Sequence, residues 1–129
     1  MLSADELNRI SNVVIGCAIE VHSVIGPGLL ESAYQKCMMW ELKRAGLVAE
    51  EQVETPLRYK EISIATAFRI DILVEHEMVL ELKCIERFEP VHAAQLLTYL
   101  KANNYRLGLL LNFNVESMRK GIKRIVNGL

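Results

Sequence analysis

Charged residues interrupt the apolar stretch from Phe68 to Glu86, which reads FRIDILVEHEMVLELKCIE. Its aliphatic and β-branched residues favour buried strands, yet Asp71, Glu81 and Lys83 lie inside the apolar runs. Carboxylates can bind a divalent cation, and a lysine amine can stabilise charge on a phosphate. Such chemistry requires a fold that brings the three side chains together.

The spacing of these residues predicts a β-hairpin centred on His76. Paired residues in a symmetric hairpin have numbers that sum to twice the centre, so Asp71 would face Glu81 and Arg69 would face Lys83. Alternation then places all four side chains on one side of the sheet. A shift of one residue in the turn would break the pairing, although Glu81 and Lys83 share a side in any register.

Two carboxylates that face each other repel, and burial increases the cost of that repulsion. A divalent cation offsets this cost, because Mg²⁺ or Mn²⁺ prefers oxygen ligands and takes one or two carboxylates plus water. A cation-bound water can act as a nucleophile, and Lys83 beside Glu81 could orient it or stabilise charge on a phosphate. The alternative is a surface ladder in which Lys83 and Arg69 neutralise the two acids; the pattern alone leaves both open.

Apolar periodicity predicts the elements that must position these residues. Helices are predicted at about 4–23, 29–45, 91–103 and 115–126, and strands at about 48–53, 68–74, 78–85 and 107–111. Segments 57–59 and 62–65 are predicted to form one bent strand or two short ones. The order α-α-β-β-β-β-α-β-α is typical of an α/β fold (α+β in the arrangement of its elements) with a central mixed sheet flanked by helices.

The composition limits the classes of protein to consider. A chain of 129 residues with 51% hydrophobic and 24% charged residues suits a single globular domain, predicted here as 1–129. We find neither a long apolar run nor a signal-peptide pattern, so no membrane association and a cytoplasmic location are expected. The three cysteines form no CxxC pair, which argues against a zinc site. A net charge of −1 argues mildly against a non-specific nucleic-acid binder.

Three motifs resemble those of one nuclease superfamily. Asp71 followed by Glu81-Leu82-Lys83 resembles the D-(x)n-(D/E)-x-K signature of PD-(D/E)xK nucleases, which share a restriction-endonuclease-like core. The segment Gly28–Tyr34 resembles the GxxExxY motif of a family of small proteins in this superfamily. Gln95–Tyr99 resembles the QxxxY motif that follows the E-x-K strand in RecB-type nucleases. Residue 70 is isoleucine where the signature has proline, and this removes no ligand.

The resemblance implies a metal-binding and catalytic set. Asp71 and Glu81 would bind Mg²⁺ or Mn²⁺ through their carboxylates, Leu82 through its carbonyl, and Glu31 directly or through water. Lys83 would be the catalytic lysine. The residues alone favour reading Glu31 as an acid stabilised by the dipole of the helix that it begins, and the resemblance reverses this preference.

The remaining site residues follow from the same resemblance. Gln95 would hold Lys83 or a phosphate, and Tyr99, which shares its helix face, would contact the nucleic-acid backbone or pack in the core. Arg69 would bind a phosphate or form a salt bridge with one of the acids. His22 is a further candidate for substrate binding.

The predicted function is metal-dependent hydrolysis of phosphodiester bonds, in DNA in preference to RNA. The alternatives are a non-catalytic nucleic-acid-binding or assembly module that keeps the fold, and a structural subunit whose charged strands only form ion pairs. Pairing into a homodimer stays open, as do strand preference and sequence preference.

Overall fold

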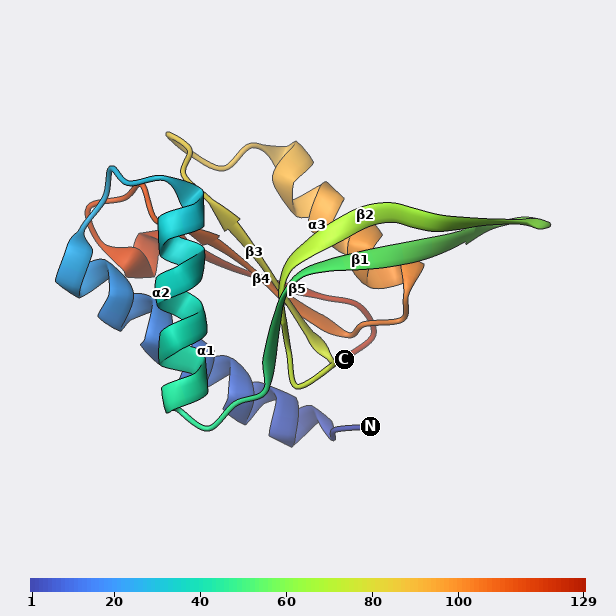
Figure 1. Cartoon of the computed structure of the whole chain (residues 1–129), viewed down its shortest axis with the longest axis horizontal. Coiled ribbons are helices and arrows are strands. Elements are labelled where there is room, and N and C mark those ends of the chain that lie inside the picture. The colour runs from blue at the N-terminus through green and yellow to red at the C-terminus, as the bar shows by residue number, and fades with distance from the viewer.

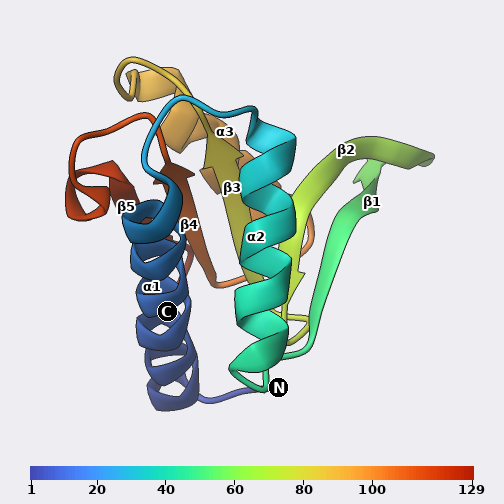
Figure 2. The ribbon, with the colours of Figure 1, turned by 60° about the vertical axis from the view of Figure 1, so that its left-hand side comes forward.

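The computed structural model describes residues 1–129 and contains a five-stranded mixed sheet with helices on both faces (Figure 1). The elements are α1 (Ala4–Ile25), α2 (Glu31–Arg44), β1 (Ala49–Tyr59), β2 (Ile62–Val74), β3 (Met78–Lys83), α3 (Pro90–Ala102), β4 (Leu107–Asn112), the short 3₁₀ helix η1 (Met118–Gly121) and β5 (Ile122–Val126). Figure 2 shows α1 and α2 on one face of the sheet and α3 on the other.

The strands lie in the order β1-β2-β3-β4-β5. β3 and β4 are parallel, and every other neighbouring pair is antiparallel. The parallel pair requires a crossover connection, and α3 supplies it. Because β3 and β4 are covered on both faces, they consist of nearly continuous apolar residues, as buried parallel strands do.

The larger apolar core lies between the sheet and the helices α1 and α2. Helix α1 begins with a capping box, in which the Ser3 hydroxyl accepts from the Glu6 N–H and the Glu6 carboxylate accepts from the Ser3 N–H. Its apolar stripe then packs at helical intervals. The buried members of this core include Leu7, Ile10, Val14, Cys17, Val21, Met38, Leu42, Leu80, Leu82, Leu109, Leu111 and Phe113.

A smaller core lies under α3, and it shows how the strands divide their side chains. It contains Leu96 and Leu100 from α3, Val79 from β3 and Leu110 from β4. Val79 packs toward α3, whereas its neighbour Leu80 packs toward α1 and α2. The alternation therefore directs Glu81 toward the α3 side of the sheet.

The hairpin of β1 and β2 extends well beyond the rest of the sheet (Figures 1 and 2). β2 pairs with β3 only from Ile72 to Val74, whereas its pairing with β1 continues outward to Ile62. The register of the arm shifts between Thr55 and Leu57, on either side of Pro56, which lacks the N–H needed for a regular ladder. The arm is the direct continuation of the strand segment that carries Asp71.

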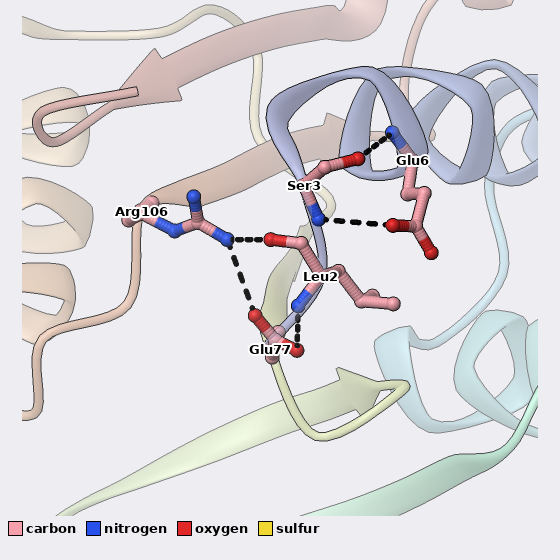
Figure 3. Close-up of polar contacts among 5 residues, drawn as sticks. All are labelled: Leu2, Ser3, Glu6, Glu77 and Arg106. Carbon is pink, nitrogen blue, oxygen red and sulfur yellow. Dashed lines mark hydrogen bonds and ion pairs between the residues drawn. The ribbon is translucent and has the colours of Figure 1, made fainter.

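Close to the chain start, an ion-paired cluster fixes the turn between β2 and β3 (Figure 3). Glu77 accepts a hydrogen bond from the Leu2 N–H at 2.8 Å, and Arg106 forms an ion pair with Glu77 at 3.3 Å. The Arg106 guanidinium also donates to the Leu2 carbonyl. Every charged group in the cluster therefore has a partner.

The structure confirms the predicted fold class, with some differences within individual elements. Segments 57–59 and 62–65 form neither one bent strand nor a separate pair of strands, because the first belongs to β1 and the second to β2. The two segments pair with each other at the outer end of the long hairpin, which turns at Lys60, whose φ is 52°.

The predicted helix at 115–126 is wrong, because this segment forms η1 and the edge strand β5. Ile122 and Ile125 would share one side of a helix, but three residues apart on a strand they point to opposite faces. Ile122 packs against the α1–α2 core and Ile125 against the α3 core, so the edge of each core gains an apolar side chain. Gly121 also passes so close to the Asn112 carbonyl that an added Cβ would lie 2.1 Å from its oxygen.

The assumed hairpin register is confirmed where β2 and β3 form a ladder. Ile72 pairs with Leu80, which centres the hairpin on His76. The ladder ends there, so Asp71 and Glu81 are not ladder partners although they are next in line. The strands begin to separate at the two acids.

None of the helices combines the length and the apolar character required to cross a bilayer.

Candidate functional site

The carboxyl end of β3 lies close to the starts of α2 and α3, and Figure 2 shows the three ends on the same side of the molecule. Glu81 and Lys83 come from β3, Asp71 from β2 and Glu31 from the first turn of α2. A surface hollow of about 620 Å³ lies elsewhere, between α1 and α2.

Asp71 takes over a hydrogen bond that the sheet ladder no longer makes. Its Oδ2 accepts from the Leu82 N–H at 2.8 Å, which closes the gap between β2 and β3. Its Oδ1 accepts from Gln52 on β1 at 3.4 Å. The carboxylate is thus held from both neighbouring strands.

Glu81 is a buried acid with an unpartnered oxygen. The residue is 6% exposed, and its Oε1 has no hydrogen-bond partner. Burial raises the pKa of Glu81 to about 9, and the charge of Asp71 and a hydrogen bond to its side chain add to this effect. Without a cation, Glu81 therefore carries a proton at neutral pH and shares it with Asp71.

A preformed loop directs Glu31 toward the acids. Gly26 and Gly28 have φ values of 75° and 106°, in the region that favours glycine. The buried Tyr34 fixes this loop, because its hydroxyl donates to the Gly26 carbonyl at 2.6 Å and accepts from the Leu29 N–H at 3.2 Å. Its ring stacks on Phe113, with the ring centroids 4.5 Å apart. Packing is therefore the role of this tyrosine.

The electrostatics of Glu31 place it beside the other charged residues. Burial raises the pKa of Glu31, and the nearby charge of Asp71 raises it further. Lys83 and the backbone N–H of Cys84 act in the opposite direction. Glu31 and Glu81 thus each interact with Asp71 and with Lys83.

Lys83 is the last residue of β3 and is half-buried. It pairs with Asn112 in the parallel ladder, and its carbonyl accepts from the Phe113 N–H at 3.0 Å. These backbone bonds fix the base of the side chain, and alternation directs it to the same side as Glu81. The charge of Lys83 is near enough to lower the pKa of Glu31 and of Glu81, and its catalytic role stays a prediction.

Tyr99 and Gln95 approach the site from α3. Burial raises the pKa of Tyr99, and the charges of Glu81 and Asp71 add to this, while a hydrogen bond from Gln95 lowers it. The ring of Tyr99 stacks on Phe68, with the centroids 4.1 Å apart. Tyr99 is therefore partly core and partly wall of the site, whereas Gln95 is exposed.

Arg69 and His22 have partners outside the acid group. Arg69 is exposed and forms an ion pair with Glu54 on β1 at 3.7 Å, not with Asp71 or Glu81. His22 is buried, and its Nε2 lies 2.7 Å from the Val115 carbonyl. Neither contact links these two side chains to the acids, and their proposed substrate contacts stay predictions.

The donor set fits a hard divalent cation in its chemistry. Asp71, Glu81 and Glu31 offer carboxylate oxygens, and the Oε1 of Glu81 has no hydrogen-bond partner, while the charge of Lys83 is too weak to offset the burial of Glu81. No group of three His, Cys, Asp or Glu side chains is arranged to hold an ion. Mg²⁺ usually binds one or two carboxylates and keeps several waters, so two acids suffice. Ligation by the Leu82 carbonyl stays a prediction.

Two residues of this region escaped the sequence analysis. Gln52 on β1 donates to Asp71, and Gln35 on α2 accepts from Gln52 at 2.8 Å. The sequence signals for these two residues are weak. Gln35 lies one helical turn after Glu31, and Gln52 is a polar residue within β1.

Comparison with known proteins identifies the family. A family model described as PD-(D/E)XK nuclease superfamily matches residues 8–125. The chain belongs to the PD-(D/E)XK nuclease superfamily. Among solved structures, this PD-(D/E)XK chain is similar to one titled "Crystal structure of SSO0001", with 16% identity and a TM-score of 0.49 over 93% of this chain and 79% of that chain. No curated protein matches it.

Proposed function

We propose that this PD-(D/E)XK chain is a nuclease that uses Mg²⁺ or Mn²⁺ to hydrolyse phosphodiester bonds, with DNA preferred over RNA. The observation that carries the proposal is the buried Glu81 carboxyl, whose Oε1 has no partner and which adjoins Asp71 and Lys83. A fold gains nothing in stability from such an arrangement, since two adjacent acids without a cation are costly. Membership of the superfamily supports the same function.

Each residue of the proposed site has a distinct task. Asp71 and Glu81 would hold the cation, with Glu31 as a further acid on the facing helix. A bound divalent cation would supply a polarised water and positive charge beside the phosphate. The Lys83 ammonium would donate to a phosphate oxygen as negative charge develops on it.

The residues on α3 would orient the substrate. The Tyr99 hydroxyl and the Gln95 amide lie on the side of α3 that faces the acids, so they could donate to the nucleic-acid backbone. The exposed Arg69 lies two residues before Asp71 on β2 and would add a positive charge for binding the nucleic-acid backbone.

A cleavage assay on plasmid and single-stranded DNA with Mn²⁺ tests the proposal. Asp71→Asn keeps an acceptor for the Leu82 N–H but removes the charge, so we expect it to lose both Mn²⁺ binding and cleavage. Lys83→Ala should bind Mn²⁺ as the wild type does and cleave about 100-fold more slowly. Calorimetric titration of Mn²⁺ measures the binding.

Lys123→Ala is the matched control, because this lysine is exposed on the edge strand β5. Its cleavage and Mn²⁺ binding should equal those of the wild type. Equal cleavage by all the variants would identify a contaminant and end the enzyme proposal. Binding of DNA without cleavage by any variant would identify a nucleic-acid-binding module instead.

Finer assignments belong to the same proposal. The segment Gly28–Tyr34 supports placing the chain in the GxxExxY group of the superfamily, as a single nuclease-like domain over residues 1–129 with a cytoplasmic location. Sedimentation of the purified protein would decide whether it forms a homodimer.

A further inference from the structure

The backbone of Gln52 has an unusual conformation inside a strand. Its φ is 51°, in the left-handed region that side-chain-bearing residues rarely adopt. Its neighbours are regular: Glu51 pairs with Ile72, and Val53 pairs with Ile70. Gln52 is thus the one position of this stretch that leaves the ladder, and the residue across from it is Asp71.

The side chain of Gln52 connects Asp71 to helix α2. Its Nε2 donates to Gln35 Oε1 at 2.8 Å and lies 3.4 Å from Asp71 Oδ1. Gln35 Nε2 in turn donates to Glu51 Oε1 at 3.4 Å, and Lys36 forms an ion pair with the same oxygen at 2.8 Å. The Gln35 amide accepts through its oxygen and donates through its nitrogen, so the bonds run in one direction from Gln52 through Gln35 to Glu51.

These contacts act on the two proposed cation ligands together. The Leu82 N–H holds Asp71 Oδ2 and Gln52 holds Oδ1, so the rotation of the carboxylate is restrained from two strands. Gln35 lies one helical turn after Glu31, so the same amide restrains the start of α2. A strained backbone persists where its surroundings enforce it, and such positions cluster at functional sites.

We propose that Gln52 is a positioning residue of the active site. Its left-handed backbone aims the side-chain amide at Asp71 and at Gln35, which fixes the orientation of the Asp71 carboxylate relative to α2 and Glu31. This inference rests on the proposed function, since the orientation matters for a cation held by these acids. A purely structural bulge would need the backbone conformation but not the amide.

Gln52→Gly separates the two roles. Glycine adopts the left-handed conformation freely, so the melting temperature of the metal-free variant should equal or exceed that of the wild type. Loss of the amide should weaken Mn²⁺ binding by about 10-fold to 100-fold, as loss of an outer contact to a metal ligand does. The exchange rate of the Leu82 amide hydrogen should rise in the metal-free protein, because Asp71 is held less firmly.

Lys60→Gly is the matched control, because Lys60 has a φ of 52° in the exposed hairpin turn. It should change neither Mn²⁺ binding nor the exchange of the Leu82 amide. Gln35→Ala should reproduce part of the Gln52→Gly effect and add little to it in the double variant.

The readouts distinguish failure of this inference from failure of the proposed function. Wild-type Mn²⁺ affinity and wild-type Leu82 exchange in Gln52→Gly would overturn the inference, and so would a lower melting temperature. If the wild type binds no Mn²⁺ but Leu82 exchange still rises in Gln52→Gly, the positioning role holds and the nuclease proposal fails.

Discussion

Glu77 lies in the turn just before β3 and Glu81 lies inside β3, four residues later, and the fold treats the two acids in opposite ways. Glu77 accepts from the Leu2 N–H and pairs with Arg106, and its side chain retains 26% of its exposure (Figure 3). Glu81 is more deeply buried, has an unpartnered oxygen and lies next to another acid.

The difference separates charge that supports the fold from charge that opposes it. An acid with a cationic partner and a backbone donor offsets its desolvation, and such a group belongs to the architecture. At Glu81 the backbone N–H of Asp71 and the charge of Lys83 do not outweigh burial and the Asp71 charge, so its pKa stays high and the protein loses stability when Glu81 must ionise. Glu77 shows that this chain can pair an acid close to β3, so the state of Glu81 agrees with the proposed cation as its partner.

The strongest way to break this comparison is Glu81→Gln. In EDTA, the folded protein holds the Glu81 proton up to about pH 9, whereas the unfolded chain releases it near pH 4.5. Stability therefore falls as the pH rises between these values, and the glutamine variant should escape this fall. We expect it to be more stable than the wild type by on the order of 5 kcal/mol at pH 8.

Urea denaturation at pH 5, 7 and 8.5 measures this difference. The gain should be smallest at pH 5, where the unfolded chain also holds much of the proton. A glutamine variant less stable than the wild type at pH 8.5 would mean that Glu81 is ionised and partnered, contrary to the comparison.

Arg106→Ala tests the other end of the strand and should have the opposite sign. It leaves the partly buried Glu77 carboxylate with only the Leu2 N–H and frees the Leu2 carbonyl. We expect a loss of about 1–3 kcal/mol in the free energy of unfolding, with Mn²⁺ binding unchanged. A stability equal to that of the wild type would mean that the Arg106 contacts do not stabilise the fold, and Glu77 would then not represent a stabilising partnered acid.

Arg69→Ala should have the smallest effect and would sharpen the comparison. Its pair with Glu54 is 3.7 Å long, and both side chains are 62% exposed, so the charge is well solvated. We expect a change within about 0.5 kcal/mol in the free energy of unfolding, measured in the same urea series. A larger loss would show that exposure is a poor guide to which charges matter here.

The sequence predicted the parts of the fold that depend on local pattern. The hairpin centre at His76 and the helix between β3 and β4 both follow from residues close together in the chain. The proximity of Asp71, Glu81 and Lys83 follows from the same hairpin, so it required no knowledge of distant contacts.

The failures have a common physical origin in long-range pairing. The spacing of Ile122 and Ile125 suits a helix and a strand equally, and only the free edge of β4 decides between them. Gln52 could not be recognised because its role depends on a left-handed backbone and on the register between β1 and β2. Neither property has a signature in one sequence.

The hydrogen bond from the Leu82 N–H also gives Asp71 a structural role, because it links β2 to β3. Glu81 bonds to no strand neighbour through its free Oε1, which in the proposed function would face the cation. The two acids should therefore diverge differently among descendants that abandon cleavage. Position 71 should be conserved as Asp or drift only to Asn, while position 81 is released early to an apolar residue. An alignment of inactive relatives would thus keep the aspartate of the signature at position 71 and lose the glutamate at position 81.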